Sequence, residues 1–539
     1  MRNKAIALLT IVCLSASALF SQSLMGPDAE VEELEHDTQQ GTYNSLVQVD
    51  SDTYLLAYQG LDGDGFIKTF TISADGATVT QVQSLTHDNI NGLYNSIVQV
   101  DSDTYLLAYT GQDNDGYLKT FTVAADGSTI TQVAVLEHDT DSGTYHSLVK
   151  VDSDTYVLAY AGNSNDGYIK TFTVPADGST ITQVAVLEHD TNQAIYNSLV
   201  QVDTDTYVLG YRDGWSDGQL KTFTIPADGS TITQVATYEY DTQQSTYNSL
   251  VKIDSDTYAV TWYGNKPAAL DTYGSWGSYI KTFTIPADGS SITAVAVLKY
   301  GNYSNYHPSW VDMGNGRLAL AYAYAGSYGE IRTFYIPLDG SAVTDMHSLY
   351  HNTAGTGQHN SLVKVDANTV ALAYSGSGSD GYISTFTIHS GLAFQSSLAL
   401  ASDNSTLAVT FDQAVFNTNG GSGALQASDF AFSLSGGATS LSSATPTSIS
   451  ISGNVVTLGI GLSGTPNGSE TLTVKPVANS IYDASGNAVL VDQKVAISVT
   501  LNDKLAPTIT STADIPVGNA TVAVTFSESV YNTNGGSGA

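Results

Sequence analysis

The chain has 539 residues, with 18 Lys and Arg against 52 Asp and Glu, which gives a formal net charge of −34. A chain this acidic cannot bind nucleic acid through a phosphate-neutralising surface, and anionic membrane surfaces should repel it. Apolar residues make up 42 % of the chain, and 33 of its residues are tyrosines. This composition supports a large buried core and excludes a disordered chain.

Residues 1–22 have the pattern of a bacterial secretory signal peptide. A basic start at 1–4 precedes the short apolar run 5–14, and small residues follow at 15–18. The alternative is an uncleaved anchor, but the apolar run is short for a bilayer span. Cys13 lies inside this segment, so the mature protein has no cysteine for disulfides or thiolate metal sites. We therefore predict a secreted or cell-surface protein without a transmembrane segment in the visible sequence.

An internal repeat dominates the remainder of the chain. The segment 34–38, Leu-Glu-His-Asp-Thr, recurs in related form at residues 85, 136, 187, 238, 298 and 349. The period is 51 residues, except for one spacing of 60 that reflects extra residues around 266–278. Repeats of 20 to 50 residues indicate solenoids or propellers. Seven such units fill residues 30–391.

Each unit is predicted to contain four short strands. In the second unit we expect strands at 94–100, 105–109, 117–123 and 128–135, separated by turns rich in Asp and Gly. The strands are rich in Val, Ile, Thr, Tyr and Phe, and no helical periodicity appears. Four strands per repeat near this period are typical of a β-propeller blade. The predicted fold is all-β, with a seven-bladed propeller as its main part.

The two ends of the repeat array are predicted to close the ring. The seventh unit stops after its third strand, 382–388, while an extra strand at 30–34 precedes the first unit in the position of a fourth strand. If this strand completes the last blade, no sheet edge is left exposed. The competing interpretation is an open β-solenoid, which does not explain the missing fourth strand.

A second type of domain begins near residue 393. The segment 406–424 has a close copy at 521–539, and the offset of 115 residues is normal for a β-sandwich. Together with 469–474 and 481–487, these motifs resemble the bacterial Ig-like domains of large surface proteins. The resemblance implies one Ig-like domain at 393–505 and the start of a second, truncated one at 506–539. We expect the natural protein to continue into further Ig-like domains.

Candidate ligand-binding residues recur once per blade. Propeller geometry places the connections from fourth to first strands, and from second to third strands, on one face, where loops carry function. The first set of connections contains His36, His87, His138, His189 and His351, then Tyr43, Tyr94, Tyr145, Tyr196 and Tyr247, then Asn44, Asn95, Asn197, Asn248 and Asn360, with His307 in the sixth unit. One hypothesis is a ring of shallow glycan pockets with multivalent avidity. The alternative is that these residues pack the blade junctions.

Two further features are specific to particular blades. The insertion in the fifth unit brings Tyr273 and Trp276, which we predict to be a special ligand feature. Asp62, Asp64, Asp113 and Asp115 make oxygen-rich loops that suit calcium, although the full run of alternating ligands with a closing Glu is absent. Calcium is the single cofactor considered. The repeated cation, for example Lys119, is expected to pair with a neighbouring Asp.

The sixth unit diverges most, and its segments 307–311 and 316–322 resemble blade strands of sialidase-like and other glycan-active propellers. Sialidases use three clustered arginines, whereas the mature chain has only Arg212, Arg317 and Arg332. A propeller polysaccharide lyase would need an acid–base pair and a cation, for which Tyr306, His307 and Arg317 could serve. The near identity of the other units speaks against one asymmetric active site.

The preferred functional prediction is therefore a binding or adhesion protein without catalysis. The propeller would be a multivalent platform, with a glycan as the first ligand class and an extracellular protein as the second. The Ig-like domains would form a stalk. The alternatives are a glycan-active enzyme, either a polysaccharide lyase or a glycoside hydrolase, and a structural or protein-interaction module.

Overall fold

The computed structural model describes residues 26–389 except for 266–275, 315, 326–327 and 353–354. It also describes 394–530 except for 412–413, 419–420, 438, 478–479, 485–496, 513–516, 519–522 and 528–529. The predicted signal peptide, Tyr273 and most of the copy at 521–539 lie outside these residues. No helix of the described part is long and apolar enough to cross a membrane.

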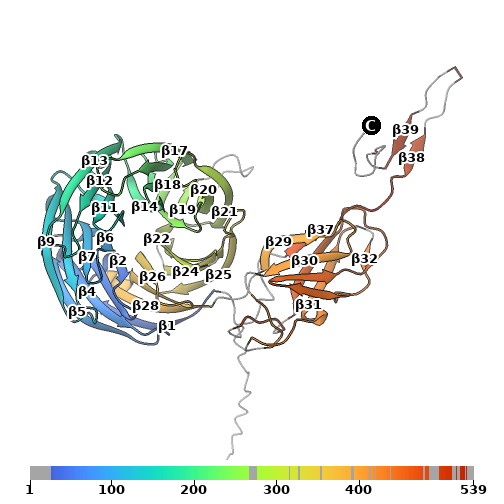
Figure 1. Ribbon diagram of the computed structural model, residues 1–539, viewed down its shortest axis with the longest axis horizontal. Coiled ribbons are helices and arrows are strands. Elements are labelled where there is room, and N and C mark those ends of the chain that lie inside the picture. Colours follow the sequence, from blue (N-terminus) through green and yellow to red (C-terminus); the bar gives the residue numbers. More distant parts are fainter. Residues whose placement is uncertain are drawn as a thin grey trace, which may run out of the picture.

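Seven four-stranded antiparallel sheets surround one axis, which confirms the predicted seven-bladed propeller (Figure 1). In each blade the strands follow the chain from the axis outward. Blades one to four are β2 (Thr42–Gln48), β3 (Thr53–Gln59), β4 (Gly65–Ile72), β5 (Val79–Asp88); β6 (Leu93–Gln99), β7 (Thr104–Thr110), β8 (Gly116–Val123), β9 (Ile130–Asp139); β10 (Thr144–Lys150), β11 (Thr155–Ala161), β12 (Gly167–Thr173), β13 (Thr182–Asp190); and β14 (Ile195–Asp203), β15 (Thr206–Arg212), β16 (Gly218–Thr224), β17 (Thr233–Asp241).

The last three blades include the ring closure. They are β18 (Ser245–Lys252), β19 (Thr257–Asn265), β20 (Trp276–Thr284), β21 (Thr293–Gly301); β22 (Asn305–Gly314), β23 (Arg317–Tyr324), β24 (Tyr328–Tyr335), β25 (Thr344–His351); and β26 (Gln358–Lys364), β27 (Thr369–Ser375), β28 (Gly381–His389), β1 (Gly26–Asp37). The N-terminal strand β1 pairs antiparallel with β28, with Leu34 opposite Ile383, and the two lie side by side in Figure 1. The ring is thus closed by the N-terminal strand, as predicted.

The core of the propeller lies between neighbouring blades. The second strands of blades one, two, three and seven are buried over their whole length, because both faces of each sheet pack against another sheet. One cluster joins Leu55 and Ala57 of β3 to Tyr105 and Leu107 of β7. The turn between third and fourth strands also bridges blades, since the Thr69 hydroxyl donates to the Gly127 carbonyl at 2.7 Å.

The outer strands differ from the prediction at their ends. In the second blade, β9 spans Ile130–Asp139, whereas the sequence predicted a strand at 128–135. Its second half alternates between exposed and less exposed side chains and reaches buried His138, so the strand period continues past the predicted end. The repeated histidines therefore lie at the ends of outer strands, and the prediction that placed them in connecting loops is wrong.

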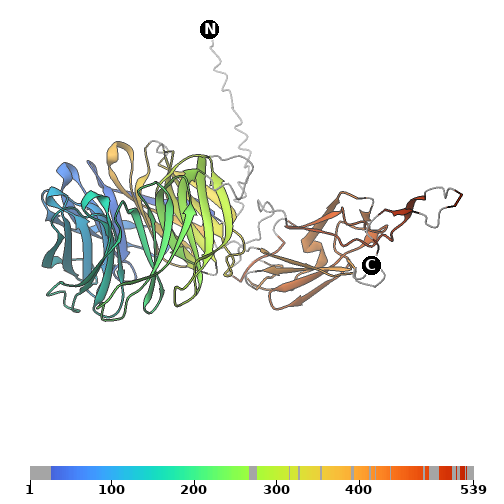
Figure 2. The ribbon, with the colours of Figure 1, turned by 90° about the horizontal axis from the view of Figure 1, so that it is seen from above.

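Residues 394–501 form a β-sandwich (Figure 2). Phe411, Phe430 and Leu472 belong to one core that the two main sheets enclose. One sheet contains β29 (Phe394–Leu400), β30 (Thr406–Phe411), β34 (Val455–Gly459) and β33 (Ile449–Ser452); the other contains β31 (Phe430–Ser435), β36 (Thr471–Pro476) and β37 (Ile497–Thr500). The remaining elements are η5 (Ala427–Asp429), the pair β32 (Ser440–Leu441) and β35 (Leu462–Ser463), and the pair β38 (Ile509–Thr512) and β39 (Val524–Phe526).

Removal of β1 is expected to open the ring. A chain that starts at residue 38 would leave the β28 backbone as an unpaired edge, and such edges promote association between chains. We expect lower thermal stability and concentration-dependent oligomers, measured by circular dichroism and by size-exclusion chromatography with light scattering. A chain that starts at Gly26 is the control. A stable monomer without β1 would contradict the closure.

Candidate functional site

The first strands of all seven blades meet at one mouth of the axis, around a cavity of about 200 Å³. The cavity lies over the N-terminal ends of these strands, at the positions where the sequence repeats Tyr-Asn. Its lining is Tyr43, Asn44, Tyr94, Asn95, Tyr145, His146, Tyr196, Asn197, Tyr247, Asn248, His307, Pro308, His359 and Asn360. We call this cavity the axial pocket. It brings together the predicted tyrosines, asparagines and His307.

One lining residue of each blade has the left-handed backbone conformation, which bulky residues rarely adopt. The seven φ angles lie between 49° and 57°, at Tyr43, Tyr94, Tyr145, Tyr196, Tyr247, His307 and His359. Each sits where the pairing of the first and second strands shifts register, for example between Thr42 and Ser45. This conformation costs about 1–2 kcal/mol per residue. Its sevenfold recurrence means that the surrounding blade contacts impose it.

The side chains of these seven residues form a closed aromatic ring around the axis. Neighbouring ring centroids lie 4.0 to 5.1 Å apart, and the shortest of these distances is between His307 and His359, which stack at 30°. Such spacings are those of favourable aromatic pairs. Five members are tyrosines, so the two adjacent histidines break the sevenfold symmetry of the ring at one place.

The asparagines of the axial pocket bind backbone atoms of the preceding blade. Asn95 Nδ2 donates to the Tyr43 carbonyl at 3.0 Å, and Asn44 Nδ2 donates to the His359 carbonyl at 3.0 Å. Asn197 and Asn360 make the same contact, while His146 Nδ1 lies 3.2 Å from the Tyr94 carbonyl. Asn248 differs, since it accepts a hydrogen bond from the Ser245 hydroxyl at 2.6 Å. The bonds to the preceding blade hold five of the seven left-handed residues in place. The asparagines therefore have a structural role as well as a place in the lining.

No residue that lines the axial pocket is Asp, Glu, Lys or Arg. Burial lowers the pKa of His307 to about 4, and burial together with His307 lowers the pKa of His359 well below its ordinary value. Burial also raises the pKa of Tyr43 and Tyr247. At neutral pH the axial pocket is accordingly uncharged, with two neutral imidazoles side by side.

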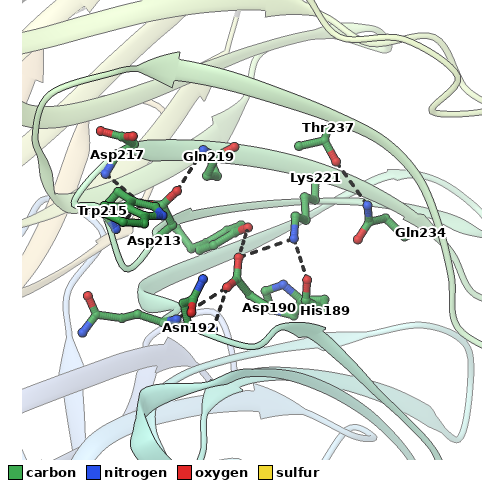
Figure 3. A network of polar contacts seen from close by, with 12 residues as sticks. His189, Asp190, Asn192, Asp213, Trp215, Asp217, Gln219, Lys221, Gln234 and Thr237 are labelled. Carbon is green, nitrogen blue, oxygen red and sulfur yellow. Dashed lines mark hydrogen bonds and ion pairs between the residues drawn. The ribbon is translucent and has the colours of Figure 1, made fainter.

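The repeated His, Asp and Lys side chains form the seams between blades instead of a ligand site (Figure 3). Asp190, at the end of the outer strand of blade three, lies 3.6 Å from Lys221 of blade four. Lys221 Nζ also donates to the His189 carbonyl at 2.6 Å. The Tyr211 hydroxyl donates to the same carboxylate at 2.8 Å. The expected pairing of the repeated lysine with an Asp is confirmed at four seams, by Lys68, Lys119, Lys170 and Lys221.

The repeated histidine rings are buried in these seams. His87 packs edge-on against Tyr109 at 4.8 Å, and its imidazole lies so close to Gly65 that a Cβ there would come within 2.6 Å. Burial, with the neighbouring lysine, lowers the pKa of His36, His87 and His189 to about 3, and burial alone does so for His351. The pKa of His138 is lowered further, again chiefly by burial. A glycan cannot reach these rings, so seven equivalent pockets built on them do not form.

The acidic loops do not assemble a calcium site. Asp62 and Asp113 lie on the exposed turns η1 (Leu61–Gly63) and η2 (Gln112–Asn114), and Asp64 and Asp115 follow them. Among the described residues, no group of three or more His, Cys, Asp or Glu side chains could hold a metal ion. Burial and the neighbouring Glu137 raise the pKa of Asp115 to about 6. The predicted calcium ligands are thus too few at any one place.

The two blade-specific predictions have different outcomes. Trp276 is 45 % exposed at the start of β20 and stacks on Tyr263 at 5.6 Å, whereas Tyr273 lies outside the described residues. The trio proposed for a lyase is not assembled. His307 lies near the start of β22, at the axial pocket. Arg317 follows the opposite end of that strand and donates to the Gly314 carbonyl.

The site also contains residues that the sequence did not single out. His359, His146 and Pro308 line the axial pocket at positions where other repeats carry Tyr or Asn. The sequence signal that could have identified these residues is a substitution within an otherwise regular repeat. His307 and His359 both replace the repeated tyrosine, in consecutive blades, and only their position around the axis makes them neighbours.

No protein-family model matches the chain, and no curated protein matches it in sequence. Its fold is similar to that of a periplasmic gluconolactonase of Pseudomonas aeruginosa, with 14 % identity and a TM-score of 0.42 over 55 % of this chain and 82 % of the other. A putative 6-phosphogluconolactonase of Bacteroides fragilis has 13 % identity and a TM-score of 0.43, over 57 % and 83 %. A putative 6-phosphogluconolactonase of Bacteroides uniformis has 12 % identity and a TM-score of 0.42, over 57 % of this chain and 84 % of the other.

These comparisons contradict the predicted function. The sequence predicted a multivalent adhesion module without catalysis, whereas the titles of these three structures name enzymes or putative enzymes. The physical reason for the error is visible in the blades: the repeated histidines stabilise seams, and the repeated tyrosines converge on one axial pocket. At this identity the likeness concerns the fold, and the substrates of those enzymes are not transferred to this chain.

The buried histidines are expected to make the fold acid-sensitive. Their pKa is about 6.5 when unfolded and about 3 when folded, so the unfolded chain takes up protons first. Stability is therefore complete above pH 6.5 and falls as the pH drops from there toward 3, by about 1.4 kcal/mol per pH unit per histidine. Urea unfolding between pH 7 and 5 measures this. His87→Phe should reduce the slope of the unfolding free energy against pH by the contribution of one histidine. An unchanged slope would show that His87 is not a buried neutral histidine in the folded state.

Proposed function

We propose that the propeller is a hydrolase whose active site is the axial pocket, and that it cleaves an uncharged ester or lactone. The observation that carries this proposal is the pair His307 and His359, stacked at 4.0 Å in the aromatic ring. These two neutral imidazoles are the one departure from tyrosine in the ring. Reactive groups in a cavity at a shared axis are the usual form of a small-molecule site.

The chemistry proposed for this pair is general base catalysis. The neutral His307 accepts a proton from a water molecule, and the resulting hydroxide attacks the substrate carbonyl carbon. The bond from that carbon to the alcohol oxygen then breaks, and the imidazolium returns its proton to the leaving oxygen. His359 stacks on His307 and restricts its orientation. The uncharged lining supports an uncharged substrate, because an ion in this cavity would lose hydration without gaining a partner.

The remaining expectations from the sequence complete the proposal. We infer export from the cytoplasm from the basic and apolar pattern of residues 1–22. The sandwich at 393–505 is proposed to be an Ig-like domain that holds the propeller away from its attachment point; its two sheets support this assignment. The likeness of blade six to sialidase-like blades stays a hypothesis about ancestry.

Replacing either axial histidine with the tyrosine of the other blades is expected to abolish activity. His307→Tyr and His359→Tyr keep an aromatic side chain at a position where five tyrosines already adopt the same backbone conformation. A lost general base lowers the rate by about 10²–10⁴-fold. Hydrolysis of a panel of lactones and aryl esters, including gluconolactone, measures kcat/KM. His87→Phe, in a seam, is the control with unchanged kcat/KM. Full activity of both tyrosine variants would refute the mechanism.

The rate is expected to be insensitive to pH until the solution is strongly acidic. His307 works in its neutral form, and burial lowers its pKa to about 4. In the folded protein, kcat/KM should be flat above pH 5 and fall tenfold per pH unit below about 4. Tryptophan fluorescence recorded at each pH separates this loss from unfolding. A midpoint between pH 6 and 7 in the folded protein would show that a different group titrates.

A further inference from the structure

In blades five and six the pairing of the second and third strands continues further toward the hairpin tip, beside the axial pocket, than in the other blades. In blades one, two, three and seven, the second and third strands are joined by the short turns η1, η2, η3 (Asn163–Asn165) and η4 (Ser377–Ser379). In blade five the pairing continues to Asn265 and Trp276, and in blade six to Tyr324 and Tyr328. These connections belong to the face that carries the axial pocket, so the extended strand ends of blades five and six lie on the pocket's side of the propeller.

Aromatic side chains gather at these strand ends and at the neighbouring outer connections. Tyr324 and Tyr328 stack at 5.0 Å, Tyr350 stands edge-on to Tyr328 at 4.9 Å, and Tyr303 lies 5.2 Å from Tyr324. Blade five adds the stacked pair of Tyr263 and Trp276. We call these six residues the aromatic wall: Tyr263, Trp276, Tyr303, Tyr324, Tyr328 and Tyr350.

The aromatic wall is exposed to solvent. Trp276 is 45 % exposed, Tyr303 56 % and Tyr350 47 %, whereas the tyrosines of the blade cores are fully buried. Large aromatic side chains that gather at the surface without burial mark binding sites more often than isolated ones do. The stacking within the wall orders these rings before any ligand arrives, which lowers the entropic cost of binding.

Contacts connect the aromatic wall to the axial pocket. The ring of Tyr306, next to His307 in β22, lies 4.9 Å from Tyr247 of the pocket, and Asn305 beside it pairs with Tyr324 of the wall. Between the two halves of the wall, the Ser278 hydroxyl donates to the Tyr303 carbonyl at 2.6 Å. A ligand in the pocket could therefore continue outward over blades five and six.

The dimensions favour a narrow ligand with apolar faces. A cavity of about 200 Å³ is smaller than the ~300–1,000 Å³ of ordinary ligand pockets, so it holds one small group and leaves the rest of a larger substrate outside. A protein partner needs about 20–30 residues per side, far more than the six of the aromatic wall. Sugar rings have apolar C–H faces and hydroxyl edges, which match the faces and hydroxyl groups of Tyr.

We propose that the aromatic wall binds the sugar rings of an oligosaccharide substrate whose ester or lactone end occupies the axial pocket. The proposal rests on the proposed function for its reacting end and names the substrate class of that site. The rings of Trp276 and Tyr350 stack on sugar faces, and the hydroxyl groups of Tyr303 and Tyr328 donate to sugar oxygens. Blade four has an exposed Trp215, but this residue is not part of the aromatic wall.

The test is binding by isothermal titration calorimetry, with cello-, laminari-, chito- and mannohexaose as probes. The catalytically silent His359→Tyr variant of the full chain serves as the background, so binding is measured whether or not hydrolysis occurs. We expect at least one hexaose to bind, and Trp276→Ala and Tyr350→Ala each to weaken it about tenfold. Trp215→Ala is the matched control, because Trp215 is 80 % exposed on the same face but outside the wall, and should bind normally.

Two results would overturn the proposal: no binding of any of the four hexaoses, or equal weakening by Trp215→Ala and the two wall variants. Activity on the small ester panel separates this outcome from failure of the proposed function. The native protein should hydrolyse small esters and Trp215→Ala should match it, whereas His307→Tyr should not. Small-ester hydrolysis by the native protein without any hexaose binding would refute the sugar subsite alone, and no hydrolysis of any ester by the native protein would refute the proposed function.

Discussion

The propeller depends on a partly buried carboxylate at the seam between consecutive blades. At each regular seam the Asp at the end of one outer strand accepts a hydrogen bond from a Tyr of the next blade and lies near that blade's Lys, as Asp88 does with Tyr109 and Lys119. The lysine ammonium also lies 5.0 Å from that tyrosine ring. Removal of the carboxylate would leave the buried Lys119 ammonium without its counter-charge, which destabilises the seam. The contacts between Asp, Tyr and Lys at a regular seam thus fix the position of one blade relative to the next.

The irregular seams keep this arrangement with different residues. Trp262 Nε1 donates to Asp241 in blade five, where other blades use a tyrosine hydroxyl. At the seam between blades five and six, Gly301 at the end of β21 stands at the position of the acid, and Glu330 on the third strand of blade six binds both Tyr322 and Arg332 instead. Blades five and six, which carry the aromatic wall, are thus also blades whose seams use other side chains.

The period of 51 residues and the extra N-terminal strand were enough to predict the fold, because strand count and ring closure follow from local patterns. The burial of His87 could not be predicted, since it depends on the outer strand continuing to Asp88 and packing on the next blade. The axial pocket was hidden for another reason. Tyr43 at a φ of 53° contradicts its own conformational preference, so only the assembled ring reveals it.

A ring of near-identical blades can still have a single reactive centre, because its axis is the one place where every blade contributes a side chain. Two substitutions in neighbouring blades, to His307 and His359, put a pair of imidazoles 4.0 Å apart. The left-handed conformation matters here, since the same shift in strand register directs each of the seven side chains to the axis. Because contacts between the blades impose this backbone conformation, they hold a histidine in it as they hold the tyrosine of the other blades. The repeated blade structure thus positions seven side chains at the axis, and the two histidines among them provide the chemistry that we propose.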